Sequence, residues 1–179
     1  MLSLENTVLT VVDVQGKLAQ LMQDKEALFH NLQRLVRGAQ ILGLPILWCE
    51  QNPAGLGPTI PELATLLAPQ QPLPKMTFSC WGCEGFQKAL QATGRRQVLL
   101  AGIEAHVCVY LTAADLVGAG YAVEVVADAV SSRTLANKQI GLDKAHQLPA
   151  GVTGAETALF ELLRTAAHPR FREVARLLK

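Results

Sequence analysis

Short aliphatic runs recur along the chain, and longer stretches with a helical spacing of apolar residues separate them. Strong runs cover residues 7–12, 45–48, 98–101 and 123–127, and weaker ones cover residues 73–76 and 151–153. Apolar side chains at successive positions are typical of parallel strands that helices cover on both faces. The runs are short and rich in β-branched residues, which disfavours buried helix segments. The pattern therefore predicts strands of a parallel sheet.

The stretches between the runs have the pattern of amphipathic helices. In residues 25–42, apolar side chains recur at steps of three and four positions, and Gly43 follows as a stop signal. Similar patterns occupy residues 86–92, 107–119, 134–147, 157–165 and 169–179. The alternation of strands and helices predicts an α/β fold. A chain of 179 residues fits one domain, and we expect residues 1–179 to form it.

Residues 51–74 depart from this pattern. The segment contains Gly55 and Gly57 and six prolines, at positions 53, 58, 61, 69, 72 and 74. Loops beyond the carboxyl ends of strands line the ligand crevice of open α/β sheets, so we interpret the segment as a shaped loop that walls a pocket. A rigid connector without a ligand role is the alternative.

Composition narrows the class of function. Half of the residues are hydrophobic, 17% are charged and the formal net charge is +1, so nothing favours a polyanionic partner and we expect no nucleic acid. The start of the chain lacks a signal-peptide pattern, and no apolar run approaches the roughly 20 residues of a membrane span. We therefore expect no membrane association and a cytoplasmic location. The four cysteines, Cys49, Cys80, Cys83 and Cys108, are too sparse for a disulfide scaffold and are predicted to be thiols.

Three residues are candidates for chemistry, and each has a structural alternative. Asp13 ends the first strand, where doubly wound folds place active sites, but aspartate there is also a common cap or turn former. Lys75 lies in a weak strand and is otherwise a solvated surface lysine. Cys108 lies near the start of a predicted helix, which favours a thiolate with a lowered pKa; the alternative is a buried, inert cysteine.

Together, these side chains can converge on one edge of the sheet. The Asp13 carboxylate can then accept the Cys108 proton, and Lys75 can offset the negative charge. The resulting thiolate can attack a carbonyl carbon. The residues thus predict a nucleophilic hydrolase site.

Four segments carry a family resemblance: TVLTVVDVQGKL, LPKMTFSCW, LLAGIEAHVCV and VEVVADAVSSR. In order and spacing they resemble the isochorismatase-like hydrolase superfamily. The stretches EQNPAGLGPTIPEL, DAVSSR and AAHPRFREV are similar to its isochorismatase domain-containing subgroup. The resemblance implies a three-layer α/β/α sandwich with a largely parallel, Rossmann-like sheet of six strands. It also implies that Asp13, Lys75 and Cys108 form a catalytic triad, and that the chain assembles as a homo-oligomer.

The resemblance further implies a non-proline cis peptide bond between Ile103 and Glu104. It assigns an oxyanion hole to the backbone N–H groups of Glu104 and Cys108. Many relatives have threonine three residues before the cysteine, whereas this chain has Ala105, so a hydroxyl hydrogen bond is missing and the turn must be held differently.

Gln15, Phe78 and Trp81 are the expected substrate contacts, and their aromatic faces and few charges predict a small, largely neutral ligand. The metal-binding motif of nicotinamidases is absent from the corresponding region, WCEQNPAGLG. The four histidines, His30, His106, His146 and His168, form no recognisable metal-site spacing. We therefore expect neither a metal nor another cofactor, and nicotinamide becomes a less favoured substrate.

The interpretation that fits best is a metal-independent cysteine hydrolase that cleaves a small amide-like substrate through a thioester on Cys108. An isochorismatase-type vinyl-ether hydrolase is the alternative within the family. Two further alternatives are a redox protein that uses the C-x-x-C motif of Cys80 and Cys83, and a catalytically silent binding protein.

Overall fold

The computed structural model describes residues 1–68 and 70–178, and its centre is an all-parallel sheet of six strands. The strands are β1 (Thr7–Val12), β2 (Ile46–Gln51), β3 (Leu73–Lys75), β4 (Gln97–Ile103), β5 (Ala122–Ser131) and β6 (Gly151–Thr153). Their order across the sheet is β3-β2-β1-β4-β5-β6, with β1 and β4 at its centre. The carboxyl ends of parallel strands meet at one edge, where open α/β sheets bind ligands.

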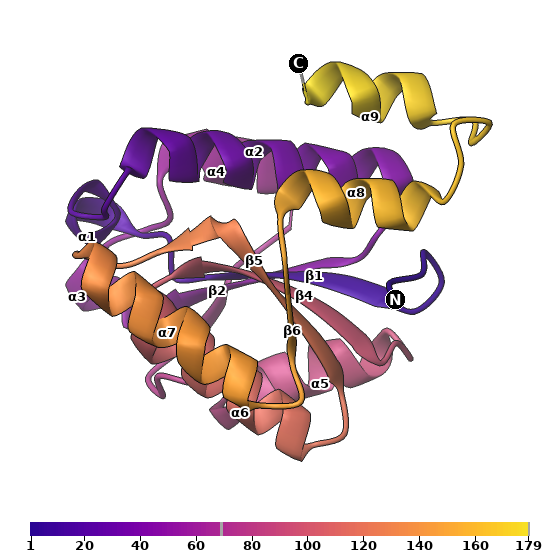
Figure 1. The fold of residues 1–179 in the computed structure, drawn as a ribbon. Coiled ribbons are helices and arrows are strands. Elements are labelled where there is room, and N and C mark those ends of the chain that lie inside the picture. Colours follow the sequence, from indigo (N-terminus) through magenta and orange to yellow (C-terminus); the bar gives the residue numbers. More distant parts are fainter. Residues whose placement is uncertain (69, 179) are drawn as a thin grey trace.

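Helices cover both faces of the sheet, which confirms the predicted three-layer α/β/α architecture (Figure 1). One face carries α2 (Lys25–Leu42), α4 (Pro61–Leu67) and α8 (Ala155–Leu163), with α9 (Phe171–Leu177) outside them. The other face carries α5 (Glu84–Ala92), α6 (Tyr110–Gly118) and α7 (Leu135–Gln147). Two short helices, α1 (Gly16–Gln20) and α3 (Pro53–Leu56), follow the carboxyl ends of β1 and β2.

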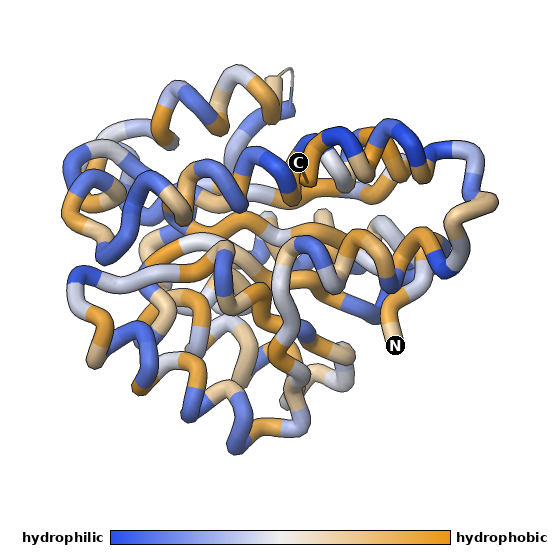
Figure 2. Tube along the Cα trace, turned by 45° about the horizontal axis from the view of Figure 1, so that its top comes forward, coloured by the Kyte–Doolittle hydropathy of each residue, from blue (hydrophilic) through white to orange (hydrophobic). Residues whose placement is uncertain are grey.

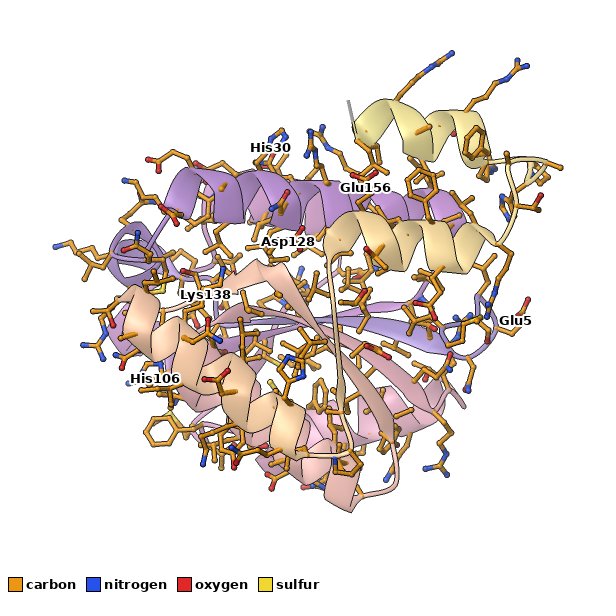
Figure 3. The ribbon with its side chains drawn as sticks, in the orientation of Figure 1. Glu5, His30, His106, Asp128, Lys138 and Glu156 are labelled. Carbon is orange, nitrogen blue, oxygen red and sulfur yellow. The ribbon has the colours of Figure 1, made fainter. Side chains whose placement is uncertain are left out.

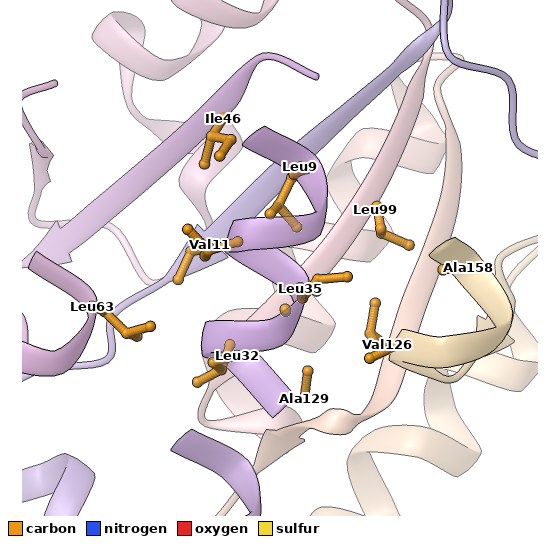
Figure 4. Close-up of a cluster of buried hydrophobic side chains, with 14 of the residues drawn as sticks. Leu9, Val11, Leu32, Leu35, Ile46, Leu63, Leu99, Val126, Ala129 and Ala158 are labelled. Carbon is orange, nitrogen blue, oxygen red and sulfur yellow. The ribbon is translucent and has the colours of Figure 1, made fainter. Parts of the chain in front are cut away.

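The strands separate two hydrophobic clusters because their side chains alternate between the faces of the sheet. Leu9 and Val11 of β1 pack with Leu32 and Leu35 of α2 (Figure 4). Val8 and Val12 join the cluster on the other face. The central strands are mainly hydrophobic, whereas the helices alternate between hydrophobic and hydrophilic residues (Figure 2). This distribution explains why the strands appear in the sequence as continuous apolar runs.

Most predicted bounds agree with the structure to within a few residues. The strand predicted at residues 45–48 extends to Gln51, and the one predicted at 123–127 extends to Ser131. Backbone pairing with neighbouring strands continues beyond the apolar run, as the pairing of Ile103 with Ser131 shows. The helix predicted at 107–119 is divided into a π-helical turn (Ala105–Val109) and α6. The last residue of the predicted helix 169–179 lies outside the described residues.

The segment of residues 51–74 is more regular than the loop we predicted. Pro53 and Pro61 begin the short helices α3 and α4, so for those residues the loop prediction is wrong. Proline has no N–H to donate and its φ angle suits the first turn of a helix, so it starts a helix as readily as it shapes a loop. Pro69 lies outside the described residues.

Two sequence features concern the surface of the molecule. Ala113, Leu116 and Tyr121 are buried within the chain, so core packing accounts for the apolar stretch of residues 113–121. None of the helices in the described part of the chain has the length and apolar character needed to cross a membrane.

Candidate active site

Asp13 follows directly after β1, and its side chain is almost completely buried. Its backbone has a φ of +53°, in the left-handed region that aspartate tolerates better than most residues. Its N–H donates to the carbonyl of Cys49 over 3.1 Å, which fixes the chain next to β2. The local backbone therefore holds a carboxylate at the carboxyl edge of the sheet.

Lys75 ends the edge strand β3 and reaches across β2 to Asp13. Its Nζ donates to Asp13 Oδ2 over 2.6 Å and to Gln51 Oε1 over 2.8 Å. It also donates to the carbonyls of Thr77 and Phe78, at 3.1 and 3.0 Å. Its side chain has no exposed surface, which excludes a solvated surface lysine. Lys75 is therefore a buried cation that donates to the Asp13 carboxylate and to three neighbouring oxygens.

Cys108 lies in the π-helical turn that follows β4, two residues before α6 begins. It is buried and lines the same cavity as Asp13. Asp13 Oδ1 is buried and has no hydrogen-bond partner within normal geometry among the described residues. This oxygen is therefore available to a proton from the Cys108 thiol. The structure thus brings Asp13, Lys75 and Cys108 together.

The site keeps the thiol neutral at rest. Burial raises the pKa of the Cys108 thiol to about 12, and the nearby Asp13 carboxylate adds to the rise. Burial also raises the pKa of Asp13, although Lys75 opposes it. Burial alone would lower the pKa of Lys75, but the Asp13 carboxylate raises it overall. The predicted lowering of the thiol pKa by a helix N-terminus is therefore wrong for the resting site, because desolvation and a negative neighbour prevail.

A cavity of about 110 Å³ opens in front of these residues. It is lined by Asp13, Leu18, Gln51, Leu56, Phe78, Ile103, Glu104, Val107 and Cys108. Five of these nine side chains are hydrophobic, and none belongs to lysine or arginine. The cavity is therefore mainly apolar, with Asp13, Gln51, Glu104 and Cys108 as its polar residues.

Of the three predicted substrate contacts, one lines the cavity and two do not. Phe78 lines the cavity and is 59% exposed, as expected for a residue at its mouth. Gln15 is fully buried and outside the lining; its Nε2 donates to the carbonyls of Gln51 and Gly57, and its Oε1 accepts from the N–H of Gln51. Trp81 is also outside the lining and packs edge-on against Tyr121, with ring centroids 5.5 Å apart. The structure does not bring Gln15 and Trp81 into the cavity.

The sequence model of the isochorismatase domain family matches residues 7–157 of the chain. The chain belongs to the isochorismatase domain family. It is 37% identical to isochorismatase domain-containing protein 2 of Danio rerio over 178 residues, covering 99% of this chain and 89% of that protein. It is 38% identical to isochorismatase domain-containing protein 1 of the same fish, but it spans only about half (52%) of that protein's length.

Three solved structures share this isochorismatase fold. The MAR1 ribonuclease of Caenorhabditis elegans has a TM-score of 0.92 and 35% identity, over 99% of this chain and 91% of that one. YcaC of Escherichia coli, described as an octameric hydrolase of unknown specificity, has a TM-score of 0.93 and 26% identity, over 99% and 88%. YcaC of Pseudomonas aeruginosa, solved with hexane-2,5-diol and covalent acrylamide, has a TM-score of 0.87 and 25% identity, over 99% and 95%. These likenesses confirm the predicted fold and family.

The turn that carries Cys108 in this isochorismatase-family chain is held without the threonine hydroxyl of many relatives. The Ile103–Glu104 peptide bond is cis. Ala105 packs so closely against Gly141 of α7 that a Cβ on the glycine would lie 2.5 Å from the carbonyl of Ala105. On either side of Ala105, Glu104 Oε1 accepts from Arg133 Nε at 3.0 Å, and His106 Nδ1 lies 3.0 Å from Ser132 Oγ. Contacts with α7 and the residues after β5 therefore brace the turn.

The remaining cysteines are all free thiols. Cys80 is completely buried in a 3₁₀ turn (Cys80–Gly82), and its N–H donates to Thr112 Oγ1 over 2.9 Å. Cys83 comes directly before α5, so the second cysteine of the C-x-x-C motif precedes the α-helix, not the first. Reactive dithiols usually present an accessible first cysteine at a helix start, and this motif lacks that arrangement.

The segment predicted to wall a pocket, residues 51–74, contributes Gln51 and Leu56 to the cavity, but the sequence singled out neither residue, and Leu18 was missed. Gln51 ends β2 beside Asp13, and a polar residue at a strand end was a usable signal. Leu18 and Leu56 reach the cavity from α1 and α3, two helices too short to leave a periodic pattern. Among the described residues, no group of three or more His, Cys, Asp or Glu side chains is arranged to hold a metal ion.

Proposed function

We propose that the chain is a cysteine hydrolase that cleaves small neutral amides through a thioester on Cys108. The observation that carries this proposal is the position of the Asp13 carboxylate next to the Cys108 thiol, with Oδ2 held by Lys75 at 2.6 Å and Oδ1 without a hydrogen-bond partner among the described residues. A neutral thiol next to a carboxylate is the starting state for attack with concerted proton transfer. Asp13, Lys75 and Cys108 then act as one catalytic unit.

In the first half of the reaction, Cys108 Sγ bonds to the carbonyl carbon while its proton moves to Asp13 Oδ1. The electrons of the carbonyl π bond go to its oxygen, and we assign the backbone N–H groups of Glu104 and Cys108, two residues of the cavity lining, to stabilise this oxyanion. When the oxyanion collapses, the C–N bond breaks and Asp13 gives its proton to the leaving amine. The product bound to the enzyme is a thioester.

In the second half, Asp13 takes a proton from water as the water oxygen attacks the thioester carbon. The C–S bond then breaks, the acid leaves, and Cys108 regains its proton from Asp13. Lys75 stays protonated throughout, since its pKa is raised and its donors are engaged with four acceptors. Its role is to orient the carboxylate and to keep it ionised when substrate arrives.

The cavity supports a small, neutral substrate. A water molecule occupies about 30 Å³, so 110 Å³ accommodates roughly four groups of that size. The lining offers no cation to a substrate carboxylate, since the cations that pair with its two acidic residues, Lys75 with Asp13 and Arg133 with Glu104, lie outside the lining. This disfavours vinyl-ether substrates of the isochorismate type, which carry carboxylates. The hexane-2,5-diol and covalent acrylamide in YcaC of Pseudomonas aeruginosa support small neutral ligands for this fold, although acrylamide bonds to nucleophiles through its alkene carbon and not through its amide.

The relative from Caenorhabditis elegans is named a ribonuclease, so RNA cleavage is a second candidate activity. Ribonucleases must neutralise phosphate, and none of the residues that line the cavity is lysine or arginine. A redox function is disfavoured because Cys80 is buried. A purely binding function is disfavoured because burying Lys75 and Asp13 costs stability, and binding alone gives this cost no chemical use.

The octameric YcaC of Escherichia coli supports a homo-oligomer for this chain as well, and light scattering of the purified protein tests it.

A panel of aliphatic primary amides of two to six carbons, with carboxylated analogues and an RNA substrate alongside, tests the proposal. We expect ammonia release from the neutral amides, none from Cys108→Ala, and a mass shift on Cys108 when a slow substrate is quenched with acid. Full activity of Cys108→Ala, or turnover of carboxylated or RNA substrates in preference to amides, would overturn it.

A further inference from the structure

A second cavity, which unlike the first is lined mainly by polar residues, lies between α2 and α9, on the opposite side of α2 from the sheet. It has a volume of about 340 Å³ and is lined by His30, Gln33, Arg34, Arg37, Arg176 and Leu177. We refer to it as the α2–α9 pocket. It shares no lining residue with the cavity in front of Cys108, and it is about three times as large.

Helix geometry places the basic residues of α2 on one face. The buried residues of α2 face the sheet and include Leu28, Leu32 and Leu35. His30, Arg34 and Arg37 follow at steps of four and three positions, so they share the opposite face. His30 lies on this outer side of α2 (Figure 3). Because α9 lies above that side, Arg176 approaches the same pocket from a second element (Figure 1).

The positive charge of this pocket is not neutralised within the described part of the chain. None of the ion pairs there includes Arg34, Arg37 or Arg176, whereas Arg170 on the same side of the molecule pairs with Glu173 at 2.9 Å. Like charges three positions apart on a helix repel each other. Such a cluster of positive charges lowers the free energy of unfolding unless a bound anion offsets the repulsion.

Arg34 adds a second, independent observation. Its Nε is buried and has no hydrogen-bond partner among residues 1–68 and 70–178. Buried donors in folded proteins almost always have a partner, and an unmet one calls for an explanation. A bound acceptor in the α2–α9 pocket supplies that partner.

We propose that the α2–α9 pocket binds a small molecule through a phosphate group. Each guanidinium is a planar fork that donates two parallel hydrogen bonds to an oxyanion. One carboxylate satisfies one such fork, but a phosphate monoester has three terminal oxygens and close to two negative charges, which match three arginines. Since small-molecule sites have volumes of about 300 to 1,000 Å³, this pocket also has room for the part that carries the phosphate, next to Leu177.

Calorimetric titration with pyrophosphate and with glycerol 3-phosphate tests this proposal, at an ionic strength kept constant with NaCl because salt screens surface charges. We expect saturable binding to the wild type. Arg34→Gln and Arg37→Gln should each weaken it by about tenfold to hundredfold, since hydrogen bonds to charged groups contribute that much. Arg172→Gln is the matched control: Arg172 is an exposed arginine of α9 that does not line the pocket, and its loss should leave affinity unchanged.

Three results would overturn the proposal. The first is equal affinity of the wild type and Arg34→Gln, or an equal loss in Arg172→Gln, which would mean general charge attraction. The second is succinate binding as tightly as the phosphates, which would assign the pocket to carboxylates. The third is a single-stranded RNA that binds more tightly than pyrophosphate and depends on Arg34. Circular dichroism melts of each variant verify that the fold is retained.

Discussion

Lys75 Nζ lies 2.6 Å from Asp13 Oδ2, although β2 separates the strands that carry them. Both side chains are almost entirely buried, so water contributes little to the solvation of either charge. A buried ion pair of this kind is costly to form, but it is far more costly to leave half-formed. Loss of either partner should therefore change both the free energy of unfolding and the catalytic activity.

Lys75→Met tests this dependence. The substitution leaves the Asp13 carboxylate buried without its counter-charge, so we expect a loss of about 3–5 kcal/mol in the free energy of unfolding. Activity should fall by about a hundredfold or more, because the base is no longer oriented. Urea denaturation and kcat/KM on the best amide of the panel measure the two effects.

The double variant Asp13→Asn, Lys75→Met is the control. It removes both charges, so most of the lost stability should return while activity stays absent. If Lys75→Met alone unfolds at the same urea concentration as the wild type, the ion pair does not carry the role assigned to it.

The pH dependence of Cys108 alkylation gives a second prediction. With a pKa of about 12, only about 0.1% of the thiol is ionised at pH 9, whereas an ordinary thiol with a pKa near 8.5 is mostly ionised there. The rate of reaction with iodoacetamide should therefore still rise between pH 9 and 10.5. Mass spectrometry of the peptide that contains Cys108 separates its reaction from that of the other cysteines.

Removal of the neighbouring carboxylate should shift this profile. Asp13→Asn takes away a negative charge that raises the thiol pKa and leaves the cation of Lys75 nearby, so the pKa of Cys108 should fall and alkylation at pH 8 should accelerate. A wild-type rate that levels off near pH 8.5 would contradict the neutral resting thiol.

The sequence was informative where the chain is periodic and uninformative where contacts bridge distant segments. Continuous apolar runs identified the strands, and polar residues at their ends identified Asp13 and Lys75 as candidates. The interaction of Gln15 with the backbone of Gln51 and Gly57 leaves no local pattern, since the partners are more than 30 residues apart. The thiol pKa was mispredicted because burial, which only the fold determines, outweighs the helix position.

Gly141 provides a third prediction. A methyl group there would lie 2.5 Å from the carbonyl carbon and oxygen of Ala105, so Gly141→Ala must displace α7 or the turn that carries Cys108. Overpacking of this kind costs about 1–3 kcal/mol of stability. We expect kcat to fall at least as strongly as stability, because a small displacement misaligns the nucleophile.

Gly118→Ala is the matched control, since a Cβ at this glycine of α6 meets nothing within 4 Å. It should stabilise the protein by about 0.5–1 kcal/mol and leave kcat unchanged, because alanine favours helix over glycine. Equal activity of the two variants would show that the contact between α7 and the turn has no bearing on the nucleophile.

Leu56 provides the last prediction, on substrate size. It reaches the cavity from α3, and Gln15 and Gly16 hold the adjoining backbone: Gln15 Nε2 donates to Gly57 O over 2.7 Å, and a Cβ on Gly16 would meet Leu56 O at 2.3 Å. A wall fixed on both sides cannot yield to a longer substrate. Leu56→Ala should therefore raise kcat/KM for amides one or two methylenes longer than the best wild-type substrate, by about tenfold relative to that substrate. Leu66→Ala, a half-buried leucine of α4 outside the lining, should leave this ratio unchanged. A uniform loss across the amide series in Leu56→Ala would mean that another part of the cavity limits substrate length, with Phe78 at its mouth the next residue to vary.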